Sequence, residues 1–167
     1  MTRARFLGGI RDIAAADWNA LAGRDYPFLR HEFLCALEDS GSVGGDSGWE
    51  PHHLLLHEGS RLVGALPCYL KQHSYGEYVF DWSWADAYRR HGQHYYPKLL
   101  SAVPFTPAAG PRLLLAEGVA FADLENELLA TVGEEMARRG ASSWHLLFPE
   151  QPVAEELAVA GLGHRTG

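Results

Sequence analysis

The segment from Ser74 to Lys98 is the part of the chain where side chains that could do chemistry are most concentrated. It holds eight of the nineteen aromatic residues, together with histidines, arginines and several acids. If residues 78–84 are extended, every second side chain shares a face. One face is then aromatic and consists of Tyr78, Phe80, Trp82 and Trp84. Such rings stack on sugars or peptides, so the segment predicts the wall of a ligand site.

Polar residues accompany these rings and could supply the convergent groups that a pocket needs. They are Glu77, Asp81, Tyr95, Tyr96 and Lys98. Asp81 lies between two large rings, and burial against rings disfavours a carboxylate, so we expect its pKa to be raised. Two other interpretations stay open: the aromatic residues fill the core, or they form an exposed protein interface.

Histidine spacing does not predict a metal site. On a strand, His53 and His57 would lie about 13 Å apart, at about 3.3 Å per residue, which is too far to share an ion. We therefore expect His52, His53 and His57 to be partly exposed strand and turn residues. His91 and His94 lack a nearby cysteine or carboxylate that would complete a ligand set.

Local motifs for phosphate binding or nucleophilic catalysis are also missing. The glycine-rich loop from Gly41 to Gly48 follows a predicted helix and leads to a strand, whereas a phosphate loop leads from a strand into a helix. We predict a plain surface loop there. The sequence has no G-x-S-x-G motif, and neither Cys35 nor Cys68 is flanked by a base, so no nucleophile is predicted.

The composition is that of one soluble domain over residues 1–167, with 47% hydrophobic and 21% charged residues. A net charge of -7 without a Lys/Arg cluster argues against nucleic acid and anionic lipid as direct partners. The N-terminal apolar stretch is interrupted by Gly8 and Gly9 and is too short for a signal sequence or a membrane span. Because Cys35 and Cys68 lack the spacing of a disulfide framework, we expect a cytoplasmic protein.

Periodicity predicts the elements that must position these residues. Helices are expected at residues 13–22, 31–40, 83–92, 121–139 and 149–161. Strands are expected at residues 52–57 and 61–70, which form a hairpin, and at 77–82, 98–105, 111–115 and 142–148. This order predicts an α/β or α+β fold, in which one mixed central β-sheet has helices on both faces and at least one right-handed parallel crossover.

Three blocks of sequence closely resemble bacterial FemAB-like proteins. They are "SGSVG" (residues 40–44), "LVGALPCYLKQHSYGEYVFDWSWADAYRRHG" (62–92) and "YYPKLLSAVPFTPAAGPRLL" (95–114). FemAB-like proteins belong to the GNAT acyltransferase superfamily and are often described as peptidoglycan biosynthesis or recognition proteins. The resemblance covers nearly the whole chain. It implies a single GNAT-like domain similar to the N-terminal half of a longer protein with two such halves.

The activity that this resemblance implies is transfer of an acyl or aminoacyl group to an amine, for example on a peptidoglycan precursor. In that chemistry a carboxylate or tyrosinate takes a proton from the amine, and backbone N–H groups stabilise the oxyanion. The implied catalytic residues are Asp81, Glu77 and Tyr95. The implied substrate-binding residues are Trp82, Trp84, Tyr96 and Lys98.

The chain departs from the superfamily pattern in two places. Residues 105–125 lack the Q/R-x-x-G-x-G/A turn that binds the pyrophosphate of coenzyme A. We therefore expect no cofactor in this half, although acyl-CoA or an aminoacyl donor is implied for a full-length protein. A closing strand is also missing after residue 163, so we expect a missing C-terminal half or a homo-oligomer to cover the open sheet edge. The alternative function is a non-catalytic glycopeptide-recognition or scaffolding module.

Overall fold

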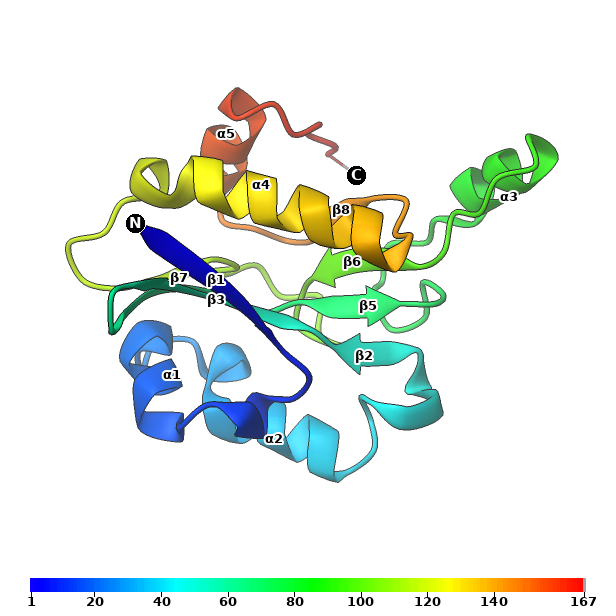
Figure 1. The fold of residues 1–167 in the computed structure, drawn as a ribbon. Coiled ribbons are helices and arrows are strands. Elements are labelled where there is room, and N and C mark those ends of the chain that lie inside the picture. The colour runs from blue at the N-terminus through cyan, green and yellow to red at the C-terminus, as the bar shows by residue number, and fades with distance from the viewer. Residues whose placement is uncertain (167) are drawn as a thin grey trace.

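The structure is a computed structural model that describes residues 1–166, and it arranges eight strands in two sheets (Figure 1). The first sheet has the order β1 (Thr2–Leu7), β3 (His53–Glu58), β4 (Arg61–Leu66) and β7 (Leu114–Leu115). The second has the order β2 (Trp49–Pro51), β5 (Tyr69–Lys71), β6 (Lys98–Ser101) and β8 (Trp144–Leu146).

The two sheets are continuous through the predicted hairpin. Strands β3 and β4 pair antiparallel across a turn that contains Gly59 at φ 60°. Strands β2 and β5 extend the same hairpin into the second sheet, and the His52 N–H donates to the Cys68 carbonyl at 2.8 Å where they meet. The single sheet that the sequence predicts is therefore divided at this point.

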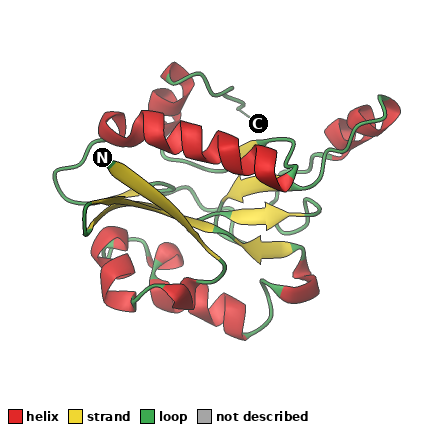
Figure 2. Ribbon diagram, in the orientation of Figure 1, coloured by secondary structure: helices red, strands yellow, loops and turns green. Residues whose placement is uncertain are grey.

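Helices cover both faces of the sheets, as the sequence predicts. Figure 1 and Figure 2 show α4 (Phe121–Arg139) and α5 (Gln151–Val159) on one side, and α1 (Ala15–Ala22) and α2 (His31–Asp39) on the other. Short 3-10 helices lie at Ile10–Asp12, Pro27–Leu29 and Gly45–Ser47. The mixed α and β class is confirmed.

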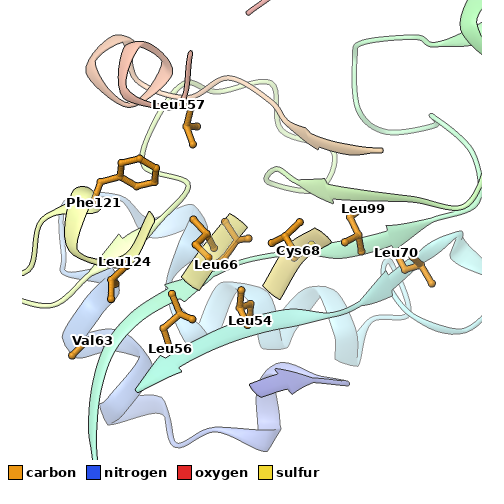
Figure 3. Close-up of a cluster of buried hydrophobic side chains, with 12 residues drawn as sticks. Leu54, Leu56, Val63, Leu66, Cys68, Leu70, Leu99, Phe121, Leu124 and Leu157 are labelled. Atoms are coloured by element: carbon orange, nitrogen blue, oxygen red, sulfur yellow. The ribbon is translucent and has the colours of Figure 1, made fainter. Parts of the chain in front are cut away.

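The main core forms where the apolar face of α4 meets the hairpin. Phe121, Leu124, Leu128 and Val132 recur at helical spacing and are buried, and α4 ends at Gly140, whose φ of 66° suits a residue without Cβ. Figure 3 shows Phe121 and Leu124 of this helix with Leu54 and Leu56 of β3 and Leu66 of β4. Strand β8 follows α4 and pairs parallel with β6, so the predicted parallel connection is confirmed.

Three local predictions were wrong. Residues 2–7 form strand β1, which pairs with β3 along its whole length, although the sequence offered no strand there. Residues 77–82 are not a strand, since a helix, α3 (Trp82–Arg90), begins at the end of this segment. The expected strands at 98–105 and 111–115 are reduced to four and two residues, because residues 102–113 leave the ladder.

The buried side chain of Arg112 holds the irregular segment 102–113 against the end of β8. Its guanidinium donates to the carbonyls of Leu147 at 2.7 Å, Pro111 at 2.8 Å and Ala108 at 2.6 Å. A planar group with five donors can satisfy several carbonyls at once, which explains how irregular backbone is tolerated beside the sheet.

Candidate active site

Residues 72–97, here called the aromatic arm, connect β5 to β6 and carry α3 away from the body of the protein (Figure 1). No residue of α3 is buried. Five side chains of the arm are between 52% and 63% exposed: Tyr75, Tyr78, Phe80, Trp82 and Trp84. A soluble domain rarely leaves so many large rings in water, and exposed apolar patches of this kind are typical of interaction surfaces.

The structure of the arm contradicts two interpretations of these rings, a shared strand face and a place in the core. They do not share a strand face, because Trp82 and Trp84 lie on a helix and Tyr78 has a φ of 61°. They are not core residues either. Two cavities lie along β1, one of about 650 Å³ against α4 and one of about 270 Å³ against the segment around Ile13, and neither of these is lined by the rings of the arm.

At the root of the arm, the predicted polar residues meet in a buried ionic cluster. Lys98 donates to Glu77 Oε2 at 2.8 Å and also bonds Asp81 Oδ2. Lys71 lies opposite Lys98 on the paired strand and reaches to within 3.8 Å of Glu77 Oε1. The Tyr95 hydroxyl donates to Asp81 Oδ2 at 2.8 Å. These buried contacts fix the base of the arm to β5 and β6.

The pKa of Asp81 is shifted in the opposite direction to the one that the sequence predicted. Burial by itself raises the pKa of Asp81, but the hydrogen bond and charge of Lys98 and the Tyr95 hydroxyl outweigh it and lower the pKa overall. For Glu77, burial outweighs the opposing charge of Lys98 and raises the pKa. Asp81 is therefore the ionised partner, since three donors or cations face its carboxylate.

Tyr95 is a hydrogen-bond donor in this cluster, not a base. Burial and the hydrogen bond to Asp81 raise its pKa, so the hydroxyl stays protonated at neutral pH. Tyr96 packs edge-on against the Tyr95 ring, with centroids 5.0 Å apart. The structure thus brings Glu77, Asp81, Tyr95 and Lys98 together, places Tyr96 beside them, and leaves Trp82 and Trp84 on the outer part of the arm.

Two further polar residues complete the cluster, and sequence reasoning missed both. Ser143 directly precedes β8 and its hydroxyl lies 2.9 Å from His145 Nε2. The other ring nitrogen, Nδ1, faces Asp81 Oδ2 at 3.8 Å. The one available signal was their i,i+2 spacing on a predicted strand, which places both side chains on the same face.

His145 is the titratable group of the cluster that reaches solvent. Its side chain is 28% exposed, whereas Asp81 is almost completely covered. Burial and then the charge of Lys98 lower the pKa of His145, against the opposing charge of Asp81. A neutral imidazole at neutral pH can accept a proton, which is the first requirement for a general base.

His52 and His53, at the start of β3, have structural roles. His52 and His53 are buried, not partly exposed as expected, and they point to opposite faces of the sheet. His52 Nε2 lies 2.6 Å from Glu135 on α4, whereas His53 Nδ1 accepts the Cys68 N–H at 3.1 Å. Within residues 1–166, no three histidine, cysteine, aspartate or glutamate side chains are placed to hold a metal ion.

The N-terminus of α4 does not fit the pyrophosphate of coenzyme A. The Asp123 carboxylate accepts the Ala120 N–H at 2.9 Å, so an acid already occupies this helix end. A negative charge at this helix end repels a phosphate.

Comparison with solved structures identifies the fold. A ribosomal-protein-alanine N-acetyltransferase from Brucella melitensis biovar Abortus 2308 is 13% identical with a TM-score of 0.56, and the match covers 100% of this chain and 96% of that chain. A GCN5-related N-acetyltransferase from Ralstonia eutropha JMP134 is 15% identical with a TM-score of 0.54, and the match covers 100% and 95% of the two chains. At these identities the similarity establishes a GNAT-type fold alone.

Sequence comparison identifies the family. No protein of curated function shows significant sequence similarity to the chain. No helix within residues 1–166 is both long and apolar enough to cross a membrane. The family model described as FemAB-like, peptidoglycan biosynthesis/recognition, matches residues 9–167. The chain therefore belongs to the FemAB-like family, as its sequence blocks predicted, and it has a GNAT-type fold.

Proposed function

We propose that this chain transfers an acyl or aminoacyl group to an amine acceptor related to peptidoglycan. The observation that carries the proposal is a neutral, half-buried His145 held between the Ser143 hydroxyl and the Asp81 carboxylate at the root of the aromatic arm. Membership of a peptidoglycan biosynthesis/recognition family supports the acceptor class, and the GNAT-type fold is compatible with acyl transfer.

In this proposal His145 accepts the proton that the acceptor amine loses as the amide bond forms. The Asp81 carboxylate faces Nδ1 at 3.8 Å, and its charge stabilises the imidazolium that results. Lys98 and Tyr95 hold Asp81 in place, and Glu77 fixes Lys98. The sequence assigned catalysis to Asp81, Glu77 and Tyr95; we now propose that they position His145.

The aromatic arm binds the acceptor in this proposal. The exposed rings of Trp82 and Trp84 can stack on the apolar face of a sugar or a peptide. Tyr96 lies closer to His145 and orients the reacting end, whereas Lys98 is fully buried and acts only through Asp81. Because the N-terminus of α4 is capped by Asp123, we propose an activated ester or thioester donor that does not rely on a pyrophosphate site at that helix.

We further propose that the chain acts in the cytoplasm as one half of a longer transferase, with a C-terminal half or a second copy covering the exposed sheet edge and the arm. Both cysteines are free thiols, which suits a reducing compartment. A stable monomer in light scattering, without any partner half elsewhere in the natural protein, would contradict this part of the proposal.

The function is tested by incubating the chain with a muropeptide that has a free amine and with an activated acyl or aminoacyl ester or thioester. We expect mass spectrometry to detect amide product. His145→Gln should lower the rate on the order of 100-fold, because it removes the general base. His57→Gln, a partly exposed histidine of β3 outside the arm, is the matched control and should react at the normal rate.

The second candidate is a glycopeptide-recognition module, which the exposed rings of the arm also favour. Calorimetry separates the two functions. Muropeptide binding without product from any donor would establish recognition and overturn transfer. Neither heat nor product would overturn both.

A further inference from the structure

Ser143, His145 and Asp81 are arranged in the sense of a catalytic triad. The Ser143 hydroxyl is 2.9 Å from His145 Nε2, while His145 Nδ1 faces Asp81 Oδ2 at 3.8 Å. In serine hydrolases the same two nitrogens have these roles: Nε2 accepts the nucleophile's proton and Nδ1 faces the acid. The residues come from two segments more than sixty positions apart in the sequence.

The proposed step requires the tautomer with the proton on Nδ1, the nitrogen that faces the Asp81 carboxylate, while Nε2 faces the Ser143 hydroxyl at 2.9 Å and the Tyr95 hydroxyl at 3.4 Å. The Tyr95 hydroxyl donates to Asp81, so the carboxylate is an ionised acceptor and attracts the N–H of Nδ1. With the proton on Nδ1, Nε2 presents a lone pair to the Ser143 hydroxyl. Lys98, the first residue of β6, donates to the same carboxylate oxygen and thereby fixes Asp81 relative to this strand.

Ser143 is also held in place and accessible. Its carbonyl accepts the Leu99 N–H at 2.9 Å, which ties the backbone to β6. Ser143 and His145 are both only half-buried, so a substrate can reach the hydroxyl. The neighbouring Ser142 differs, because its hydroxyl donates to the Tyr95 carbonyl and is engaged in holding the cluster together.

We propose that Ser143 is a covalent nucleophile, which forms an acyl-serine with an activated ester or thioester before the acyl group passes to an amine. This inference rests on the proposed function and deepens it, because it adds a covalent step between donor and acceptor. The missing G-x-S-x-G motif is no obstacle, since nucleophile and base are recognised by geometry and not by local sequence.

The proposed reaction has two half-reactions, acylation of Ser143 and transfer of the acyl group to the amine. In the first, the Ser143 Oγ–C bond forms and the donor C–O or C–S bond breaks, while His145 Nε2 takes the serine proton and gives it to the leaving alcohol or thiol. In the second, the acceptor N–C bond forms and the Oγ–C bond breaks, and the amine proton passes through His145 back to Oγ. Water in place of the amine gives slow hydrolysis of the acyl-serine.

The test uses two serine-directed probes, a fluorophosphonate and p-nitrophenyl acetate, without any acceptor. We expect one adduct per chain, mapped to Ser143 by peptide mass spectrometry, and a burst of about one p-nitrophenolate per chain. Ser143→Ala should abolish both. His145→Gln should slow them on the order of 100-fold, with circular dichroism confirming the fold. Ser60→Ala, an exposed serine in the β3–β4 turn, is the control and should label normally.

The outcomes distinguish this inference from the proposed function. Absence of an adduct, an adduct elsewhere, or normal labelling of Ser143→Ala would overturn the covalent step. If Ser143→Ala also kept forming amide, direct transfer would stand in its place. Labelling of Ser143 with no amide from any donor would support the nucleophile while overturning the transferase.

Discussion

Lys71 and Lys98 face each other across β5 and β6, and both side chains are fully buried. Their surroundings differ. Lys98 has two carboxylate partners, whereas Lys71 donates to the Tyr75 carbonyl at 3.0 Å and lies over the Trp49 ring. Burial lowers the pKa of Lys71 to about 7, with the charge of Glu77 opposing this shift. We therefore expect a charged Lys71 to destabilise the folded protein and Lys98 to stabilise it.

The stability of the protein should rise with pH above neutrality because of Lys71. In the unfolded chain a lysine titrates near 10.4, so between pH 7 and that value the unfolded state binds more protons than the folded state. The free energy of unfolding then increases with pH, by at most about 1.4 kcal/mol per pH unit. Lys71→Met should remove this increase, as measured by urea unfolding at pH 7, 8 and 9. A wild-type slope that survives in Lys71→Met would contradict the assignment.

Lys98→Met is the matched comparison and should behave differently. It leaves Glu77 and Asp81 buried without their cation, so we expect a loss of about 3–5 kcal/mol at pH 7. Equal stability of the two methionine variants would show that Lys98 is not the anchor of the arm.

The aromatic arm is an element whose rings contribute little to folding. Trp82 and Trp84 are more than half exposed, so Trp82→Ala and Trp84→Ala should change the free energy of unfolding by less than about 0.5 kcal/mol. Each should weaken muropeptide binding roughly three- to tenfold in calorimetry, because a stacked ring is lost. Wild-type affinity in both variants would exclude the arm as the binding surface.

Trp18 provides the contrast for the stability measurement. It is fully buried, and its indole N–H donates to the Leu29 carbonyl at 2.8 Å. Trp18→Ala should therefore cost about 3–5 kcal/mol in urea unfolding. Arg24→Ala, an exposed residue after α1 and outside the arm, is the control for binding and should leave both quantities unchanged.

Strand β1 connects the layers of the whole molecule. Phe6 stacks on His52 with centroids 4.5 Å apart, and His52 bonds Glu135 on α4. Leu7 packs in a second hydrophobic cluster, together with Trp18 of α1 and Leu34 of α2. Removing residues 1–7 should therefore cost several kcal/mol, from two apolar side chains at about 1.5–3 kcal/mol each and the lost ladder.

Urea unfolding followed by circular dichroism measures this effect. The control is the double variant Arg3→Ala and Arg5→Ala, whose side chains are exposed, and its stability should stay within about 0.5 kcal/mol of the wild type. A truncated protein as stable as the full chain would show that β1 is dispensable.

Much of the architecture was readable from local pattern. Helix α4 and the β3–β4 hairpin were predicted because the period of their apolar residues is set by backbone geometry within a few positions. The sequence blocks also identified the family, and they located the segment where Glu77, Asp81, Tyr95 and Lys98 converge. The shared site was thus indicated by residue types that are close in the chain.

The charge states in that cluster were decided by tertiary contacts alone. The pKa of Asp81 was expected to be raised, yet Lys98, 17 positions away, lowers it. His145 joins Tyr95 across 50 positions, through the parallel pairing of β6 and β8. Local sequence determines which conformations a segment prefers, but the charge state of a group depends on which distant charges and how much water the folded chain leaves beside it.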